Sequence, residues 1–325
     1  MSAITLNEFG GPENLTESTV QRPEPGPGEV LIEVAAAALN RADLMQRQGH
    51  YPPPPGASDI LGLEVSGRIA ALGPQVDNWS VGDEVCALLS GGGYAEFAVA
   101  PTTQLFHVPE TVGLVDSAAL PEVACTVVSN LDMTAHLQPG ELALLHGGSS
   151  GIGTFGIQFA RARGAIVATT ARTADKLTLC AGLGATVLID YTDDDFVQRV
   201  QEKGGADVIL DMVGAKYLSR NVDALAPDGR LVVIGLQGGA TAEIDLGKLL
   251  RIRGTLAATN LRGRPTTGPH SKADVVARTT ELAWPLIESR QIAPVVGTTF
   301  PMSEAAAAHE YLAGGDAVGK ILLVR

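Results

Sequence analysis

The hydrophobic pattern of the first third of the chain predicts a domain made of short strands. Residues 28–34 read Gly-Glu-Val-Leu-Ile-Glu-Val, with apolar β-forming residues between two glutamates, and further short strand-like segments follow at residues 67–73, 81–87 and 91–99. Glycine and proline residues separate these segments. Because short strands interrupted by such residues are typical of barrels and sandwiches, we expect a β-rich domain here.

From about residue 124 the pattern changes to strand, glycine-rich turn and helix, repeated several times. The apolar segments are short and β-branched, as in strands that are buried on both faces of a parallel sheet. They occupy residues 142–145, 166–170, 186–189, 208–211 and 231–234. This alternation predicts an α/β domain with a doubly wound parallel sheet. After residue 259 we expect mainly loops, then a helix at 303–312 and a strand at 320–324.

The composition fits a globular protein of about two domains. The chain has 325 residues, of which 45% are hydrophobic, and a formal net charge of -13. Such a negative charge disfavours nucleic acid as a partner, because binding to nucleic acid depends on neutralising phosphates with Lys and Arg. No apolar stretch approaches the ~20 residues that span a bilayer, and the first residues do not resemble a signal peptide. We therefore expect a cytoplasmic protein that binds neither membrane nor nucleic acid and whose three cysteines are buried thiols.

The junction after the strand at 142–145 has the features of a dinucleotide-binding turn. Residues 146–153 read His-Gly-Gly-Ser-Ser-Gly-Ile-Gly and lead into a helix with apolar residues on one side. Glycines let the backbone approach a pyrophosphate, and the N-terminal N–H groups of the helix attract the anion. A literal Gly-x-Gly-x-x-Gly at 151–156 begins inside the helix, so we favour the earlier register. Its candidate residues are Gly148, Ser149, Ser150, Gly151, Ile152 and Gly153. A tight strand-to-helix turn without a ligand is the alternative interpretation.

The end of the next strand favours NADPH over NADH. Enzymes that bind NAD usually carry Asp or Glu here, about 20 residues past the glycines, to hold the ribose 2′-hydroxyl. Ala171 takes that position, and Arg172, Thr173 and Lys176 follow it. Two positive charges and a hydroxyl suit a 2′-phosphate. Asp175 departs from this pattern, although an acidic side chain in the first turn of a helix also suits the helix dipole.

The segment at 38–51, Ala-Leu-Asn-Arg-Ala-Asp-Leu-Met-Gln-Arg-Gln-Gly-His-Tyr, precedes four prolines and the sequence Gly-Leu-Glu-Val-Ser-Gly at 62–67. It resembles the zinc-independent, ζ-crystallin-like quinone oxidoreductase family of the medium-chain dehydrogenases/reductases, and within it the p53-inducible type most closely. In the zinc enzymes of that superfamily the first motif carries a cysteine ligand and the second reads Gly-His-Glu. Here Leu63 replaces the histidine, and no cysteine lies near residues 40–43.

The chain therefore carries no recognisable zinc motif. Its three cysteines, Cys86, Cys125 and Cys180, lie too far apart in the sequence for any short metal-binding pattern. We expect no metal, although a site assembled from distant residues, for example with His50 or Glu64, stays open.

The resemblance implies a Rossmann NADPH-binding domain at 124–260 and a GroES-like catalytic domain formed by residues 1–123 and 261–325. It also implies roles for individual residues. The catalytic candidates are Tyr51, Asn40 and Thr126, and the residues expected beside the cofactor are Tyr191, Gly235, Leu236, Asn260 and Leu261. Tyr51 would border the substrate, to which its phenol can donate a hydrogen bond. The alternatives are a tyrosine packed on prolines for Tyr51, a turn-stabilising side chain for Asn40 and a merely packed ring for Tyr191.

Three functions remain open at this point. The first is an NADPH-dependent quinone oxidoreductase that transfers hydride to a small-molecule quinone without a metal. The second is reduction of the C=C bond of an enoyl thioester or alkenal, with Tyr51 as proton donor. The third is a non-enzymatic NADPH-binding structural or regulatory protein. The resemblance also implies a homodimer, for which the apolar stretch at 249–258 is our candidate contact.

Overall fold

The computed structural model describes all 325 residues, which form two compact units. Unit 1 consists of Met1–Cys125 and Arg262–Arg325, and unit 2 of Thr126–Leu261. The expected boundaries at residues 124 and 261 lie within two residues of this division. No helix combines the length and the apolar composition that crossing a bilayer requires.

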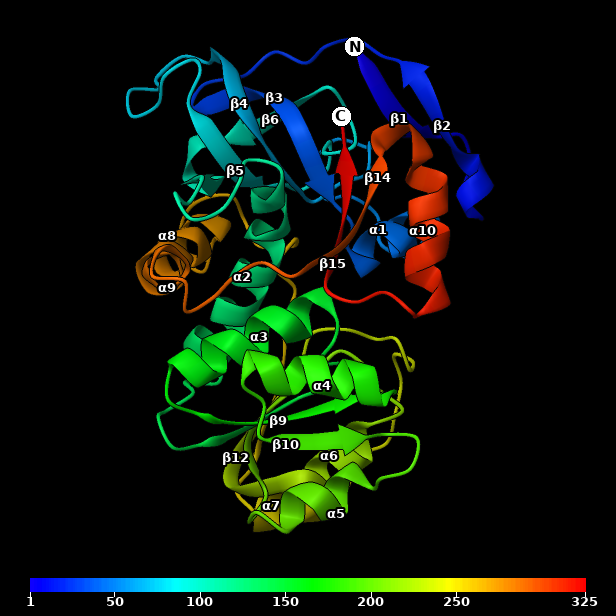
Figure 1. Ribbon diagram of the computed structural model, residues 1–325, viewed down its shortest axis with the longest axis vertical. Coiled ribbons are helices and arrows are strands. Elements are labelled where there is room, and N and C mark those ends of the chain that lie inside the picture. The colour runs from blue at the N-terminus through cyan, green and yellow to red at the C-terminus, as the bar shows by residue number, and fades with distance from the viewer. The chain divides into compact units, whose positions relative to one another are not determined.

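Unit 1 is built around a mainly antiparallel sheet of seven strands, in the order β14-β15-β3-β4-β5-β7, with β6 also paired to β3. The seven strands are β3 (Glu29–Ala38), β4 (Glu64–Leu72), β5 (Glu84–Leu88), β6 (Phe97–Pro101), β7 (Leu105–His107), β14 (Val296–Pro301) and β15 (Lys320–Val324). Two further strands of the unit, β1 (Ser2–Leu6) and β2 (Leu15–Thr19), form a separate antiparallel pair. The red β15 lies beside the blue β3 (Figure 1), so the last strand completes the sheet that the first third begins.

The helices of unit 1 are short and lie around this sheet. They are α1 (Arg41–Arg47), α8 (Lys272–Leu282), α9 (Trp284–Glu288) and α10 (Ala305–Gly314), while α2 (Pro121–Val127) contains the division between the units. Buried apolar side chains from β3, β4, β5, β6 and α10 form one core, with Ile32, Val65 and Leu323 almost fully enclosed.

Two expectations for unit 1 need correction. The strand expected at 91–99 begins only at Phe97, and Gly91 and Gly92 before it adopt positive φ angles of 150° and 95°. The region after residue 259 contains α8 and α9 rather than only loops. Ser271 and Asp274 form a reciprocal capping box at the start of α8, and this Ser-x-x-Asp spacing is a sequence signal that could have revealed the helix.

Unit 2 is a six-stranded parallel sheet with helices on both faces. Its elements are β8 (Leu142–Leu145), α3 (Gly151–Ala162), β9 (Ile166–Ala171), α4 (Ala174–Leu183), β10 (Val187–Asp190), α5 (Phe196–Gln201), β11 (Ala206–Asp211), α6 (Leu218–Ala224), β12 (Leu225–Val233), α7 (Leu246–Arg251) and β13 (Thr255–Ala258). In Figure 1, α3 and α4 cover one face, and α5, α6 and α7 the other.

The strand order β10-β9-β8-β11-β12-β13 is the 3-2-1-4-5-6 order of the Rossmann fold. All five strands that the sequence predicted for this unit are present, and every pairing is parallel. All four residues of β8 are buried, as expected for a central strand covered on both faces. The predicted doubly wound α/β domain is therefore confirmed.

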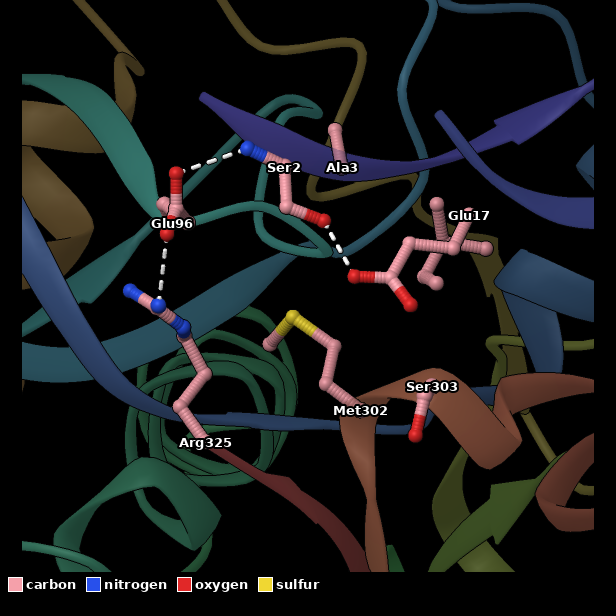
Figure 2. Close-up of a pocket in the computed structure, with 8 residues that line it drawn as sticks. Ser2, Ala3, Glu17, Glu96, Met302, Ser303 and Arg325 are labelled. Atoms are coloured by element: carbon pink, nitrogen blue, oxygen red, sulfur yellow. Dashed lines mark hydrogen bonds and ion pairs between the residues drawn. The ribbon is translucent and has the colours of Figure 1, made fainter. Parts of the chain in front are cut away.

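A small pocket of unit 1 lies where the two ends of the chain meet (Figure 2). The Glu96 carboxylate accepts hydrogen bonds from the Ser2 backbone N–H at 2.6 Å and from the Arg325 guanidinium at 2.7 Å. Met302 borders the same space. None of the residues that the sequence singled out for function lines this pocket. Through Glu96, the two hydrogen bonds link β1 to the residue that follows β15.

Candidate functional site

In unit 2 the predicted cofactor residues gather at one edge of the parallel sheet. The glycine-rich turn follows β8, Arg172 follows β9, Tyr191 follows β10, and Gly235 lies two residues beyond the end of β12. The Asn260–Leu261 segment follows β13 in the same way. The carboxyl ends of parallel strands share one edge, which is where open α/β sheets bind ligands.

Two glycines of the glycine-rich turn are packed too tightly to be replaced by residues with a side chain. A Cβ atom on Gly148 would stand 2.1 Å from Thr169 Oγ1, and one on Gly153 would stand 2.3 Å from the Gly147 carbonyl oxygen. Ser150 is the N-cap of α3, and its Oγ accepts a hydrogen bond from the Gly153 N–H at 3.0 Å. Gly151 and Ile152 form the first turn of α3, and Ser149 is buried before it. The literal Gly-x-Gly-x-x-Gly at 151–156 therefore begins inside α3, as expected.

The turn is joined to the neighbouring strand through a buried histidine. His146 contacts Thr170 Oγ1 at 3.2 Å and Asn221 Oδ1 at 2.8 Å through its two ring nitrogens. Thr170 Oγ1 also accepts a hydrogen bond from the Gly147 N–H at 3.1 Å. Burial lowers the pKa of His146 to about 4, so the imidazole is neutral at pH 7. His146 thus supports the turn as a neutral residue.

The end of β9 presents basic side chains at the rim of the sheet. Arg172 is exposed, Lys176 is half-buried, and Thr173 caps α4 by accepting a hydrogen bond from the Lys176 N–H at 3.3 Å. The Tyr191 N–H donates to the Ala171 carbonyl at 3.2 Å, and the Tyr191 side chain is 43% exposed. Asp175 lies in the first turn of α4, as expected. Arg172, Lys176 and Tyr191 therefore belong to one region of the unit.

Met212, which the sequence analysis missed, connects the glycine-rich turn to the end of β12. Ser150 Oγ lies 4.0 Å from the Met212 sulfur. A Cβ atom on Gly235 would stand 2.7 Å from the Met212 carbonyl oxygen, so only glycine fits there without a shift of the backbone. Leu236, the next residue, is 49% exposed. A methionine after a strand carries no recognisable motif, which explains why it was missed.

Asn130 was also missed, and it brings two predicted segments together. Its Nδ2 donates to the Thr126 carbonyl at 2.7 Å, and its Oδ1 accepts from Thr259 Oγ1 at 2.6 Å. Thr126 is therefore joined, through one buried amide, to the strand end that leads to Asn260 and Leu261. Asn260 is exposed and Leu261 is buried. The helical segment that carries Asn130, Val128–Thr134, has π-helical geometry, which is frequent at functional sites.

In unit 1 the predicted residue Asn40 belongs to a buried ionic network. The Lys320 ammonium donates to Glu64 Oε1 at 2.6 Å and to Asn40 Oδ1 at 2.8 Å, and Asn40 Nδ2 donates to Glu64 Oε1 at 2.9 Å. Glu64 Oε2 accepts from the Glu122 N–H at 2.8 Å. Both ends of the Asn40 amide are thus engaged by protein groups, while its predicted place beside the nicotinamide stays a prediction.

Two further carboxyl groups beside this network have raised pKa values. Burial raises the pKa of Asp43 to about 6, although the carboxylate accepts hydrogen bonds from the Asn40 and Gly62 N–H groups. Burial and then the negative charge of Glu64 raise the pKa of Glu122 to about 8. Glu122 is therefore mostly protonated at pH 7 and can donate a proton.

Tyr51 lies in the same unit and is held by an arginine that the sequence analysis did not single out. Burial raises the pKa of Tyr51 to about 12, so the phenol keeps its proton at neutral pH. The Arg262 guanidinium lies 5.2 Å from the centre of the Tyr51 ring and donates to the Tyr51 carbonyl at 3.3 Å. Tyr51 is therefore a protonated hydrogen-bond donor on an anchored segment. An arginine next to the boundary of a domain gives no sequence signal for this contact.

The chain brings together no group of three or more His, Cys, Asp or Glu side chains that could hold a metal ion. Leu63 is 1% exposed and lies in the apolar interior of unit 1. Cys86, Cys125 and Cys180 are separate buried thiols. Burial raises the pKa of all three thiols, which keeps them in their unreactive protonated form.

Two family models match the chain. Residues 26–110 match the alcohol dehydrogenase GroES-like domain, which confirms the predicted GroES-like part of unit 1, and residues 183–323 match the model described as zinc-binding dehydrogenase. Among solved structures, a mycobacterial protein in complex with NADPH superposes with a TM-score of 0.90 at 32% identity, and each chain is covered completely. The Escherichia coli quinone oxidoreductase in complex with NADPH gives a TM-score of 0.90 at 28% identity, also with complete coverage of both chains.

Curated relatives are similar over the whole length. A protein of Pseudomonas aeruginosa named quinone oxidoreductase is 34% identical, over 99% of this chain and 98% of the relative. A Burkholderia protein named 2-haloacrylate reductase is 30% identical, over 99% of this chain and 98% of the relative. These matches extend across both units, and the similar solved structures share the fold. The chain therefore belongs to the quinone oxidoreductase type of the medium-chain dehydrogenase/reductase family.

Proposed function

We propose that this protein is an NADPH-dependent quinone oxidoreductase. The observation that carries the proposal is the assembly of the predicted cofactor residues at the carboxyl edge of the six-stranded sheet of unit 2. The full-length relative from P. aeruginosa bears the name of this activity, and two similar solved proteins hold NADPH. The relatives are named for reactions that they catalyse, which favours an enzyme over the non-enzymatic alternative.

The residues at this edge fit NADPH. The N–H groups of Gly151 and Ile152, in the first turn of α3, have no partner within the helix and can face a pyrophosphate. The N–H groups of Gly148 and Gly153 instead bond to the Thr170 carbonyl and to Ser150 Oγ, which holds the turn in shape. Ala171 offers no carboxylate to the ribose, whereas Arg172 and Lys176 offer positive charge to a 2′-phosphate. Tyr191, Gly235, Leu236 and the Asn260–Leu261 segment would border the remainder of the cofactor.

A titration of the protein with NADPH and with NADH tests this assignment. We expect tighter binding of NADPH, and we expect Arg172→Ala and Lys176→Ala to weaken NADPH binding about tenfold each while NADH binding stays nearly constant, since a charge-assisted hydrogen bond contributes roughly 1.5–3 kcal/mol. Arg253→Ala is the matched control, because Arg253 pairs with Asp228 on the surface after α7. An unchanged preference in both variants would remove the argument for NADPH.

Bound NADPH would supply the hydride, and the side chains of the protein would position the acceptor and stabilise its developing charge. A quinone that receives hydride becomes a hydroquinonate anion, which one hydrogen-bond donor can stabilise. Tyr51 is suited to this role because its phenol stays protonated. Thr126 is our second candidate next to the reacting centre, whereas we assign Asn40 to holding the buried network. No metal is needed for this chemistry.

Reduction of an activated C=C bond is the second candidate, and the Burkholderia relative named 2-haloacrylate reductase favours it. Here Tyr51 would have to deliver a proton to carbon. Side-by-side turnover of 1,2-naphthoquinone and a crotonyl thioester with NADPH separates the two functions. If quinones were poor substrates and Tyr51→Phe abolished reduction of the thioester, the second candidate would replace the first.

We further propose that the protein forms a homodimer through the outer edge of the sheet in unit 2. The strand β13 pairs only with β12, and Leu256 on it is 40% exposed. The adjacent α7 exposes Leu246 and Leu250 to 67% and 80%. Unpaired edge strands beside apolar side chains favour association. Light scattering should give twice the mass of the chain for the wild type. The variant Leu250→Glu should shift the protein toward the monomer. A monomeric wild type would exclude the dimer.

We also propose that the protein is cytoplasmic, a proposal supported by three buried free thiols, which suit a reducing compartment. Fractionation of cells that produce the protein tests this assignment.

A further inference from the structure

Arg262 makes more hydrogen bonds than any other arginine of unit 1, and it is only 5% exposed. Its Nε and Nη2 donate to the Ser90 carbonyl at 2.9 and 2.7 Å, and Nη2 also donates to Gln46 Oε1 at 2.8 Å. Its Nη1 donates to the Tyr51 carbonyl at 3.3 Å. The planar guanidinium can reach all these acceptors at once, whereas a lysine ammonium cannot, because its three donors diverge from one atom.

The same arrangement holds the other end of the proline-rich segment. Gln46 Nε2, on α1, donates to the Asp59 carbonyl at 3.1 Å, while Gln46 Oε1 accepts from Arg262. The segment at 51–59 is therefore fixed at its first residue by Arg262 and at its last residue by Gln46. The four prolines at 52–55 have no N–H groups to donate to neighbours. The anchoring of this segment thus depends on its two ends.

Building on the proposed function, we propose that Arg262, supported by Gln46, is a positioning residue that fixes the ring and the main chain of Tyr51 against the bound acceptor. The guanidinium sits over the ring at 5.2 Å, a distance at which a cation and an aromatic face attract each other. Its positive charge also opposes the rise in the Tyr51 pKa that burial causes. A displaced phenol would orient the acceptor poorly, which is costly because errors of about 1 Å can lower rates about 100-fold.

A double-mutant cycle with Arg262→Lys and Tyr51→Ala tests whether Arg262 acts through Tyr51. Arg262→Lys keeps the charge and loses the planar fork, so we expect kcat/KM for 1,2-naphthoquinone to fall about 10- to 100-fold while the Kd for NADPH stays within about twofold. In the Tyr51→Ala background, the same change should lower kcat/KM less than about threefold, because the ring to be positioned is gone. Equal losses in both backgrounds would overturn the proposal.

Arg264→Lys is the matched control, because Arg264 lies two residues away and donates to the His270 carbonyl rather than to the segment at 51–59. Gln46→Met releases the Asp59 end without removing a charge, and it replaces Arg262→Lys should that variant fail to fold. Gln46→Met should lower kcat/KM in the same direction, and its effect should also shrink in the Tyr51→Ala background.

Hydrogen exchange provides a second measurement that needs no turnover. Amides at 56–60 should exchange at least about fivefold faster in Arg262→Lys and Gln46→Met than in the wild type, and should not change in Arg264→Lys. Unchanged exchange in both Arg262→Lys and Gln46→Met would show that these two residues do not anchor the segment at 51–59. A wild-type protein that reduced no quinone would refute the proposed function, while the exchange rates would still decide whether Arg262 and Gln46 hold the segment.

Discussion

The Lys320 ammonium lies 2.6 Å from Glu64 Oε1, and the two side chains are only 5% and 0% exposed. Lys320 begins the last strand, β15, while Glu64 begins β4, so the pair joins segments that are 256 residues apart. Burying two charges is costly unless further hydrogen bonds satisfy them. Here Asn40, the Leu39 carbonyl and the Glu122 N–H supply those bonds.

Removing one member of this pair should destabilise the protein strongly. Lys320→Met leaves the Glu64 carboxylate buried without its cation, so we expect a loss of about 3–5 kcal/mol in the free energy of unfolding. Urea denaturation of the variant and of the wild type measures this loss. Adding Glu64→Gln to Lys320→Met should restore part of the stability, because neither position of the pair then carries a charge. Arg253→Ala, which breaks an exposed pair, should have a far smaller effect.

Glu122 should make the protein less stable as the pH rises. Its pKa is about 8 in the folded protein, against 4.5 for an ordinary glutamate. Between these two values the unfolded chain loses the proton that the folded chain keeps. Stability is therefore full below about pH 4.5 and declines until the pH passes about 8, by an amount on the order of a few kcal/mol.

The variant Glu122→Gln removes this dependence. Thermal unfolding from pH 5 to pH 8.5 should show the Tm of the variant falling less than that of the wild type, with the largest gain at the alkaline end. Asp43, whose folded pKa of about 6 is also raised, keeps a smaller decline of the same sign in both proteins. Parallel Tm curves for the two proteins would contradict the assignment of a raised pKa to Glu122.

His309 should make the protein less stable as the pH falls below about 6.5. Burial lowers its pKa to about 3, so the folded protein resists a proton that the unfolded chain takes up below about pH 6.5. Its Nε2 lies 3.3 Å from the Tyr94 hydroxyl. His309→Gln should cost about 1 kcal/mol at pH 7 through the altered hydrogen bond, yet should flatten the loss of stability between pH 6.5 and pH 4. Urea denaturation of both proteins at several pH values measures this effect. Equal changes of the unfolding free energy with pH in the wild type and in His309→Gln would contradict the prediction.

Replacement by alanine should be harmful at one glycine of unit 2 and stabilising at another. In Gly148→Ala the new methyl group would meet Thr169 Oγ1 at 2.1 Å, so the turn must shift, and we expect NADPH binding to weaken at least about tenfold through its displaced N–H groups. Gly182 lies in α4 with open space around its Cβ position, so Gly182→Ala should stabilise the protein by about 0.5–1 kcal/mol. Fluorescence titration and urea denaturation measure the two effects. A Gly148→Ala variant with wild-type affinity would show that the turn does not contact the cofactor.

The sequence predicted the features that depend on neighbours along the chain. The strands β8 to β12 are short apolar segments, and the glycine-rich turn lies between a strand and a helix, so both can be recognised locally. The basic residues after β9 follow from the same local pattern. Motifs of this kind also carry the resemblance that identified the family, which the full-length relatives confirm.

The tertiary structure decided everything that depends on distant residues. Asn40 bonds to Lys320, which arrives from the other end of the chain, and no pattern in the sequence indicated this contact. Tyr51 acquires its anchor from Arg262, 211 residues later. The free energy of a buried charge or a fixed ring depends on which groups surround it in space. The order of residues therefore determined the elements and the family of this protein, while packing alone determined its ionic network, its shifted pKa values and the position of its tyrosine.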